Sequence, residues 1–329
     1  MVDATRANPA THNGVLARLA ALGPTYGALV ALVLLFVGNC LFTTNFNDVN
    51  NFKNILVEVT PKMLVAVGMT LVIATGGIDL SVGSVMAVAS ALVATNLDSG
   101  LGVAVLIAML AATAVGTVNG ALISGFRIQP IIVTLGMLIA GRGAAQLMNS
   151  GKLIPFTDPT FEYLGKGMVG PLPLVGGVPV QVLVMLAVVA LGIFVVRATA
   201  FGRYVIAVGG NEAAAHLAGI KVHRTKISVY ALSALLAGLA GLIETSRLGA
   251  SDAAKVGLNI ELDAIAAVVV GGTPLTGGRA TVVGTFIGAL IMQIITTSFN
   301  MRGIPFSWGL VLKAAIILIA VYIQRPKVA

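Results

Sequence analysis

Long apolar runs dominate the sequence and set the strongest limit on its fold. Ten of them follow one another, over residues 25–43, 55–75, 80–97, 101–124, 129–148, 179–197, 226–246, 261–273, 280–300 and 305–324. A helix needs about 20 apolar residues to cross a bilayer, and it satisfies its own backbone hydrogen bonds in lipid. Only 10% of the residues are charged, against roughly 25% in a soluble domain. The sequence therefore predicts an all-α integral membrane protein with about ten transmembrane helices.

Charged residues between the runs predict how the chain is oriented. The segment 197–226 has an excess of basic over acidic residues (Arg197, Arg203, Lys221, Arg224 and Lys226 against Glu212). Because loops rich in Lys and Arg stay in the cytoplasm, we expect this segment there. The charges of loop 149–178 balance, and we expect that loop in the periplasm. The tails 1–24 and 325–329 carry basic residues and are expected in the cytoplasm, on either side of one transmembrane domain over residues 25–324.

A short motif occurs twice and indicates an internal repeat. Gly76-Gly77-Ile78-Asp79-Leu80-Ser81-Val82-Gly83 has its counterpart in Gly271-Gly272-Thr273-Pro274-Leu275-Thr276-Gly277-Gly278, and a Val-rich run precedes each. Paired glycines in the middle of a membrane break a helix, and the freed backbone is tolerated only against protein or a water-filled cavity. We therefore expect two glycine-broken helices. The two breaks are six runs apart, which implies parallel repeats unless one segment is re-entrant.

The repeated motif supplies the candidate residues of a translocation path or gate. These are Gly76, Gly77, Asp79, Ser81, Gly271, Gly272 and Thr273. The alternative is that the glycines only let helices approach closely, which is the usual role of G-x-x-x-G pairs such as those at 116–120 and 284–288.

Six charged residues lie in or beside the apolar runs: Asp79, Arg142, Glu244, Asp263, Arg279 and Lys313. Isolated charges in lipid are costly, so such residues are usually paired, face a cavity or serve a function. Asp79 follows a glycine pair and is expected to cap the next helix with help from Ser81. Glu244 can pair with Arg247 on one helix face. Lys313 is expected either to extend to the membrane surface or to pair with Asp263.

The motifs of common catalytic and metal sites are absent from the sequence. Gly151-Lys152 and Gly165-Lys166 lack the rest of a phosphate-binding loop, and no G-x-S-x-G elbow occurs. The histidines and the single Cys40 have no metal-ligand spacing. We expect no catalytic residue, no metal and no bound cofactor, and hence no enzyme. The net charge of +8 is explained by basic cytoplasmic loops, so no nucleic-acid partner is expected.

The basic segment contains a pattern that predicts a short helix. In the stretch 209–220, Asn211 can cap the helix, Glu212 suits its positive start, and Gly219 can end it. A rigid helix on a cytoplasmic loop can transmit force to a soluble partner. The alternative is an ordinary connecting helix.

These motifs carry a family resemblance. Together with residues 63–84 and 261–272, the loop closely resembles the bacterial ABC monosaccharide permeases, among them the ribose, xylose, arabinose and galactofuranose importers. The likeness extends from about residue 25 to 324 and implies a type II ABC importer-like permease domain in the bacterial inner membrane, multi-pass and with both termini cytoplasmic.

The resemblance also implies partners. We expect an ATPase subunit inside, which uses the ATP, a periplasmic sugar-binding protein outside, a second permease copy or a sister permease, and surrounding membrane lipid. Carried over by matching positions, the ATPase-coupling contact is made by Gly210, Asn211, Glu212, Ala213, Ala214, Gly219 and Ile220. The element from Gly77 to Ser81 is expected near the pathway.

The favoured interpretation is a permease subunit that lets a monosaccharide cross while the partner's ATP cycle switches its access. One alternative is a cation-coupled secondary sugar transporter, in which Asp79 or Asp263 changes protonation during the cycle. Others are an ABC permease for another small polar solute and a channel-like or structural membrane protein, which has no need of a coupling loop.

Overall fold

The computed structural model describes residues 23–170 and 177–324, and this part of the chain is helical throughout apart from short turns and two-residue strands. Its thirteen α-helices are α2 (Gly23–Phe42), α3 (Val49–Ala74), α4 (Val82–Asn96), α5 (Leu101–Gly125), α6 (Pro130–Met148), α7 (Pro159–Lys166), α8 (Val180–Ala198), α9 (Ala200–Gly210), α10 (Glu212–Leu217), α11 (Val222–Leu248), α12 (Ile260–Val270), α13 (Val282–Met301) and α14 (Phe306–Gln324). A 3-10 turn, η1 (Leu97–Ser99), extends α4.

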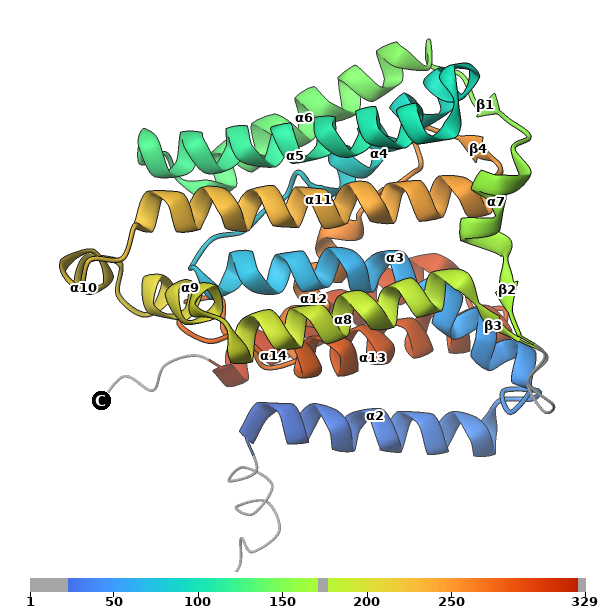
Figure 1. Ribbon diagram of the computed structural model, residues 1–329. Helices are drawn as coiled ribbons and strands as arrows, with labels where there is room; N and C mark the ends of the chain where they lie inside the picture. Colours follow the sequence, from blue (N-terminus) through green and yellow to red (C-terminus); the bar gives the residue numbers. More distant parts are fainter. Residues whose placement is uncertain (1–22, 171–176, 325–329) are drawn as a thin grey trace, which may run out of the picture.

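Four short strands form two antiparallel pairs. β1 (Ile154–Pro155) pairs with β4 (Ala250–Ser251), and β2 (Met168–Val169) pairs with β3 (Val178–Pro179). Together with α7 they gather at one end of the bundle, whereas α9 and α10 lie at the other end (Figure 1). The start of α2 and the end of α14 lie at the α9 end. The predicted cytoplasmic segment and the predicted periplasmic loop are therefore on opposite sides of the molecule.

Each of the ten predicted apolar runs contains a helix, but the helices differ in length. Seven are long and apolar enough to cross a membrane: Val49–Ala74, Val82–Ser99, Leu101–Gly125, Pro130–Met148, Val180–Ala198, Val222–Leu248 and Val282–Met301. α2 and α14 contain shorter apolar stretches. With 11 residues, α12 is about 16 Å long at 1.5 Å per residue and cannot cross a hydrocarbon core of about 30 Å.

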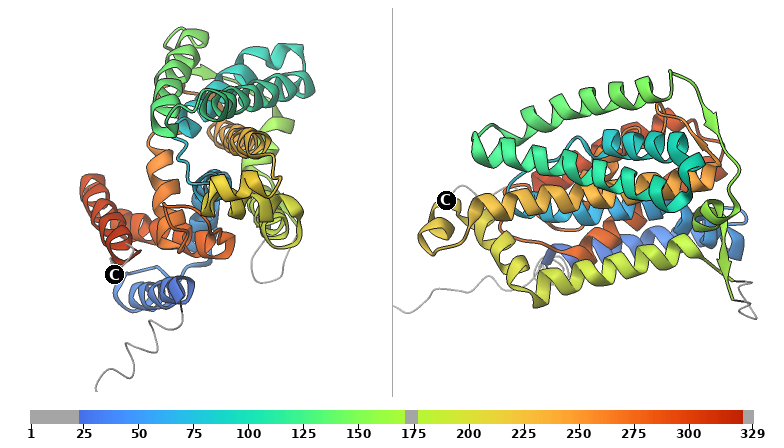
Figure 2. Two further views of the ribbon diagram at one scale, coloured as in Figure 1. Left: turned by 90° about the vertical axis from the view of Figure 1, so that its left-hand side faces the viewer. Right: turned by 45° about the horizontal axis from the view of Figure 1, so that its top comes forward.

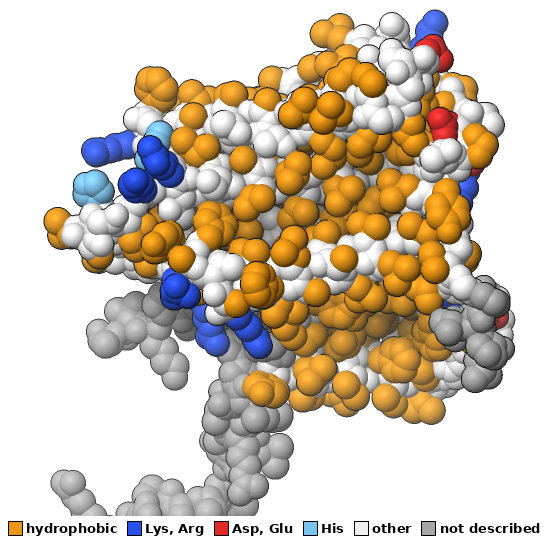
Figure 3. All heavy atoms as spheres, in the orientation of Figure 1, with side chains coloured by type: hydrophobic (Ala, Val, Ile, Leu, Met, Phe, Trp, Pro, Cys, Tyr) orange, Lys and Arg blue, Asp and Glu red, His pale blue; other side chains and the backbone are white. Residues whose placement is uncertain are grey.

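The bundle has two sides with α3 and α11 between them. Seen end-on, α4, α5 and α6 form one side, and α2, α13 and α14 form the other (Figure 2). Side chains of α3 such as Met63 and Leu64 are fully buried in the main core. Large apolar side chains cover the outer middle of the visible face, and Lys and Arg gather at the α9 end (Figure 3). This is the surface of a protein that sits in lipid.

Close packing of the central helices depends on small residues. A Cβ atom on Gly116 of α5 would lie 2.3 Å from the carbonyl oxygen of Tyr230 on α11, and one on Gly120 would lie 2.6 Å from Cα of Ile227. The second G-x-x-x-G pair packs α13 against α12 in the same way, since a Cβ on Gly288 would lie 2.1 Å from the carbonyl oxygen of Ala267. The packing role predicted for both pairs is confirmed.

The glycine pairs of the repeated motif lie where helices end, and a non-helical segment follows each pair. Gly76 follows the end of α3, and Gly271 caps the end of α12. The loops after them meet beside α9: the N–H of Gly278 donates to the carbonyl of Ala74 (3.0 Å), and Cβ on Gly209 would touch both residues. Both Val-rich helices thus end at the same side, as parallel repeats require.

Irregular backbone enters the bundle in two segments, residues 75–81 before α4, which include Gly76 and Gly77, and residues 252–259 before α12. The second of these segments, residues 252–259, is held by Arg142 of α6. The guanidinium donates to four carbonyls, those of Ala253 (3.0 Å), Val256 (2.7 Å), Gly257 (3.4 Å) and Gly83 (3.3 Å). One side chain therefore supplies donors to carbonyls of this non-helical segment and ties residues 253–257 to the first turn of α4.

We predict that Arg142→Ala destabilises the protein by on the order of 3 kcal/mol, because charge-assisted bonds are lost and the carbonyls stay unpaired. Thermal unfolding of the purified chain in detergent measures the effect. Arg127→Ala, which removes an exposed arginine between α5 and α6, is the matched control and should unfold like the wild type. Equal stability of both variants would show that Arg142 does not hold this segment.

Candidate functional site

A cluster of polar side chains surrounds the start of α4 inside the bundle. The carboxylate of Asp79 accepts hydrogen bonds from the backbone N–H (3.0 Å) and the hydroxyl (2.6 Å) of Ser81 through Oδ1. Its Oδ2 accepts from the hydroxyl of Ser233 on α11 (3.4 Å), and Asn119 of α5 donates to Oγ of Ser81 (2.9 Å). We call these four residues the Asp79 cluster. Ser81, and not Asp79, is the N-cap residue of α4, and no side chain caps the first turn. Asp79 bonds to Ser81 just before the helix, so the predicted capping by Asp79 is wrong, although its contact with Ser81 forms.

The Asp79 cluster is fully buried and holds no basic side chain. All four members have a relative exposure of 0%, and no ion pair to Asp79 occurs in the described part of the chain. Two further polar atoms nearby, Oδ1 of Asn119 and the hydroxyl of Tyr230, are buried without a hydrogen-bond partner. The Tyr230 hydroxyl rests against Gly77, where a Cβ would lie 2.4 Å from it. These atoms can still form a hydrogen bond if the cluster rearranges or admits a polar molecule.

The second copy of the motif has a different environment. The hydroxyls of Thr273 and Thr281 lie 2.9 Å apart, the N–H of Thr281 donates to Thr273 (3.1 Å), and the Thr281 hydroxyl donates to the carbonyl of Gly271 (3.1 Å). These bonds fix the loop between α12 and α13. Among the described contacts, none joins Thr273 to Asp79, so the structure brings the glycine loops together but not all of the predicted path residues.

A network of charges joins α3, α12, α13 and α14. Lys313 pairs with Asp263 at 2.8 Å, which confirms one of the two predicted roles of Lys313. Lys62 lies 3.7 Å from the other oxygen of Asp263 and donates to Gln293 (2.7 Å), whose amide donates to Glu58 (2.6 Å). The network holds the short helix α12 against the three longer helices. The sequence analysis missed Lys62 and Glu58, although their charges inside the apolar run 55–75 were a usable signal.

The predicted ion pair between Glu244 and Arg247 does not form among the described residues. Glu244 instead accepts a hydrogen bond from the backbone N–H of Gly257, and Nε of Arg247 has no partner. Both residues stand near the end of α11, where the loop 252–259 offers backbone donors. Local spacing on a helix could not predict this tertiary contact.

The short helix α10 forms as the sequence predicts. The side chain of Asn211 caps it by accepting from the N–H of Ala214 (2.9 Å). At its other end, Gly219 adopts a positive φ of 82°, and the N–H groups of Gly219 and Ile220 donate back to His216 and Ala215 (both 3.0 Å). This pair of hydrogen bonds is a Schellman motif, which ends the helix at a defined residue.

α10 projects beyond the bundle (Figure 1) and is anchored by an ion pair. Glu212 pairs with Lys226 of α11 at 2.6 Å, and 57% of the Glu212 side chain remains exposed. Leu217 is 88% exposed. A recess of about 700 Å³ beside the helix is lined by residues such as Arg127, His216 and His223, and Ser124 is hydrogen-bonded to His223 (2.7 Å). α10 therefore offers an apolar tip and a recess to a partner.

No group of three or more metal-ligating side chains occurs within the described ranges. The site consists of a buried polar cluster, a charge network and a rigid external helix. Such an arrangement is suited to conformational change and docking.

We predict that Asp79→Asn preserves folding, because asparagine retains an oxygen that accepts from Ser81, and that it keeps part of the protein's transport activity. Asp79→Leu should lose about 1–3 kcal/mol because the N–H of Ser81 is then buried without a partner. Membrane abundance, thermal unfolding and uptake measure both variants. Complete loss of uptake by the asparagine variant at normal abundance would contradict a purely structural role of Asp79 and point to the pathway or gate.

We predict that Asp263→Asn destabilises the protein by on the order of 2 kcal/mol, because Lys62 and Lys313 then face each other without an anion. Adding Lys313→Met should restore part of the loss, since it removes one of the two like charges. Thermal unfolding of the single and double variants measures the coupling. If the single variant is as stable as the wild type, the network does not hold α12.

The chain matches known permeases along most of its length. Residues 51–321 match the family described as "Branched-chain amino acid transport system / permease component". No solved structure matches the chain. Among its relatives is the ribose import permease protein RbsC of Escherichia coli K12, which is 40% identical over 304 residues, covering 91% of this chain and 93% of the relative.

Two further relatives are named for sugars other than ribose. The galactofuranose transporter permease protein YtfT of Escherichia coli K12 is 38% identical, with 91% of this chain and 89% of the relative covered. The fructose import permease protein FruF of Bifidobacterium longum is 35% identical, with 92% and 87% covered. The family and these relatives are named as permeases, so the chain is a transport protein and not an enzyme. The chain belongs to this family of multi-pass ABC-importer permeases.

Proposed function

We propose that this chain is the membrane subunit through which an ABC importer carries a monosaccharide, a pentose or a hexose, into a bacterial cell. The observation that carries the proposal is the match, over about nine-tenths of the chain, to permeases named for ribose, galactofuranose and fructose. The sugars for which these relatives are named differ, so the proposal names monosaccharides as a class and not one particular sugar. The family description names amino acids, and a permease for another small polar solute is the second candidate.

The proposed topology has ten crossings. α2, α3, α5, α6, α8, α11, α13 and α14 each make one, and residues 75–81 with α4 and 252–259 with α12 make the other two. Support comes from the start of α2 and the end of α14, which lie at the same end as α9 and α10 (Figure 1). With the basic segment 197–226 inside, loop 149–178 lies outside and both tails, 1–24 and 325–329, are cytoplasmic. These tails lie outside the described residues.

In this proposal the coupling contact is made by α10 and its caps. An ATPase subunit would dock on the exposed surface formed by Gly210, Asn211, Glu212, Ala213, Ala214, Gly219 and Ile220. α10 is capped at both ends and tied to α11 by the Glu212–Lys226 pair. A displacement of α10 would therefore move α11, and through Ser233 of α11 it would act on the Asp79 cluster. ATP would be used by that subunit, and this chain would bind no cofactor.

The proposed path or gate comprises the first copy of the motif, which contacts α11 through Asp79 and Ser233, and the loops of both copies, which meet beside α9. Asp79 and Ser81 belong to the buried cluster, whereas Gly76, Gly77, Gly271, Gly272 and Thr273 form the loops beside α9. A second permease copy or a sister permease would complete the pathway. A sugar-binding protein would dock at the opposite end, on α7 and the two strand pairs.

The direct test is Glu212→Arg. The variant should lose most of its ATPase in a mild-detergent pull-down and should uncouple ATP hydrolysis from uptake, because the reversed charge repels Lys226 and alters the docking surface. Glu162→Arg is the matched control: Glu162 pairs with Lys166 at 2.7 Å at the other end of the bundle, and its reversal should leave the ATPase bound. Wild-type uptake by the Glu212 variant would refute the coupling assignment.

A further inference from the structure

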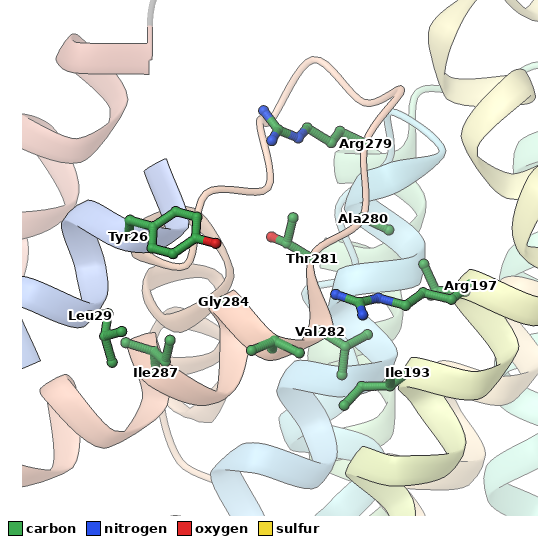
Figure 4. Close-up of a pocket in the computed structure, with 12 residues that line it drawn as sticks. Tyr26, Leu29, Ile193, Arg197, Arg279, Ala280, Thr281, Val282, Gly284 and Ile287 are labelled. Carbon is green, nitrogen blue, oxygen red and sulfur yellow. The ribbon is translucent and has the colours of Figure 1, made fainter. Parts of the chain in front are cut away.

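A recess opens at the α9 end of the bundle, on the side away from α10. It has a volume of about 400 Å³ and lies between α2, α8 and the loop that leads into α13. Figure 4 shows the side chains that line it. None of the residues assigned above to coupling or to the path, and no member of the charge network, lines this recess.

The polar side of the recess is cationic. Arg197 comes from the last turn of α8 and Arg279 from the loop before α13, and the hydroxyls of Tyr26 and Thr281 point toward each other (Figure 4). Its lining contains no acidic residue. Within residues 23–170 and 177–324, neither arginine forms an ion pair or a side-chain hydrogen bond. Two guanidinium groups without an acidic partner and the hydroxyl of Tyr26 therefore line the same recess, and donors of this kind favour an oxyanion.

The other side of the recess is apolar and faces the membrane. Leu29, Ile193 and Ile287 lie below the polar groups in Figure 4. The outer surface of α8 next to them carries Leu191 and Phe194, which are 60% and 59% exposed. The recess thus changes from cationic at the bundle end to apolar toward the middle of the membrane, and its opening between helices gives access from the lipid.

We propose that this recess binds an anionic phospholipid, with the phosphate of the headgroup on Arg197 and Arg279 and the upper part of an acyl chain along Leu29, Ile193 and Ile287. Basic recesses between transmembrane helices at the cytoplasmic surface are suited to such headgroups. A free phosphate shares the headgroup chemistry but makes no use of the apolar wall. The chain's own N-terminal segment is a poor occupant, because residues 1–22 carry Arg6 and Arg18 against Asp3. The proposal does not depend on which solute is transported.

Native mass spectrometry of the full chain in neutral detergent tests the site. Phosphatidylglycerol should bind more tightly than phosphatidylcholine, and Arg197→Gln/Arg279→Gln should weaken phosphatidylglycerol binding by about 30-fold, at roughly 1 kcal/mol for each basic residue. Arg197→Lys/Arg279→Lys keeps the charge and should retain most of the affinity. Lys53→Gln/Lys152→Gln removes two basic residues at the opposite end and should bind like the wild type.

Three results would overturn the proposal. In the first, the Arg→Gln double variant binds phosphatidylglycerol as tightly as the wild type. In the second, excess inorganic phosphate displaces phosphatidylglycerol, which would make the recess a site for free anions. In the third, the double variant keeps its lipid but loses its ATPase in a pull-down, which would assign the arginines to a protein contact. Excess phosphate without effect, together with the charge-dependent loss, would support the phospholipid.

Discussion

Backbone hydrogen bonding inside the membrane is the constraint on which the rest of this structure depends. Two of the apolar helices, α4 and α12, begin inside the bundle, and the segments before them cannot satisfy their own backbone groups. Arg142 supplies donors to the carbonyls before α12, and Asp79 supplies an acceptor to an N–H at the start of α4. The charged side chains of Arg142 and Asp79 therefore lie in the interior because each forms hydrogen bonds with backbone groups there.

The carboxylates of Asp79 and Asp263, which a cation-coupled transporter would use, both have hydrogen-bond or ion-pair partners. Asp79 accepts from three donors on Ser81 and Ser233, and Asp263 lies between Lys62 and Lys313. Neither arrangement leaves a free carboxylate facing an access route, whereas α10 stands exposed on a rigid base. This geometry supports the proposal that energy enters through a partner docked on α10, while the buried polar groups hold the short helices in place.

Much of the fold could be predicted from the sequence because its signals are local. Apolar runs specify helices wherever lipid is the solvent, and Asn211 and Gly219 set the two ends of α10 through bonds to residues a few positions away. The pairing of Lys313 with Asp263 was also accessible, since two opposite charges in lipid have few alternatives.

The remainder depends on contacts between distant segments. That the loops after α3 and α12 meet beside α9 depends on a contact between Ala74 and Gly278, which are about 200 positions apart and which no local pattern specifies. The length of α12 is another case: residues 252–259 are non-helical because Arg142, more than a hundred positions earlier, holds their carbonyls. The partner of Glu244 is likewise a backbone group brought in by the fold.

The central claim is that a docked ATPase drives this permease. The most direct measurement is uptake of labelled ribose, galactofuranose and fructose into vesicles that contain the chain with its ATPase and binding protein, with either ATP or a proton gradient as the energy source. The account predicts uptake of at least one monosaccharide that requires ATP and all three proteins and is lost with Glu212→Arg. Uptake by the chain alone, driven by the proton gradient, would contradict it.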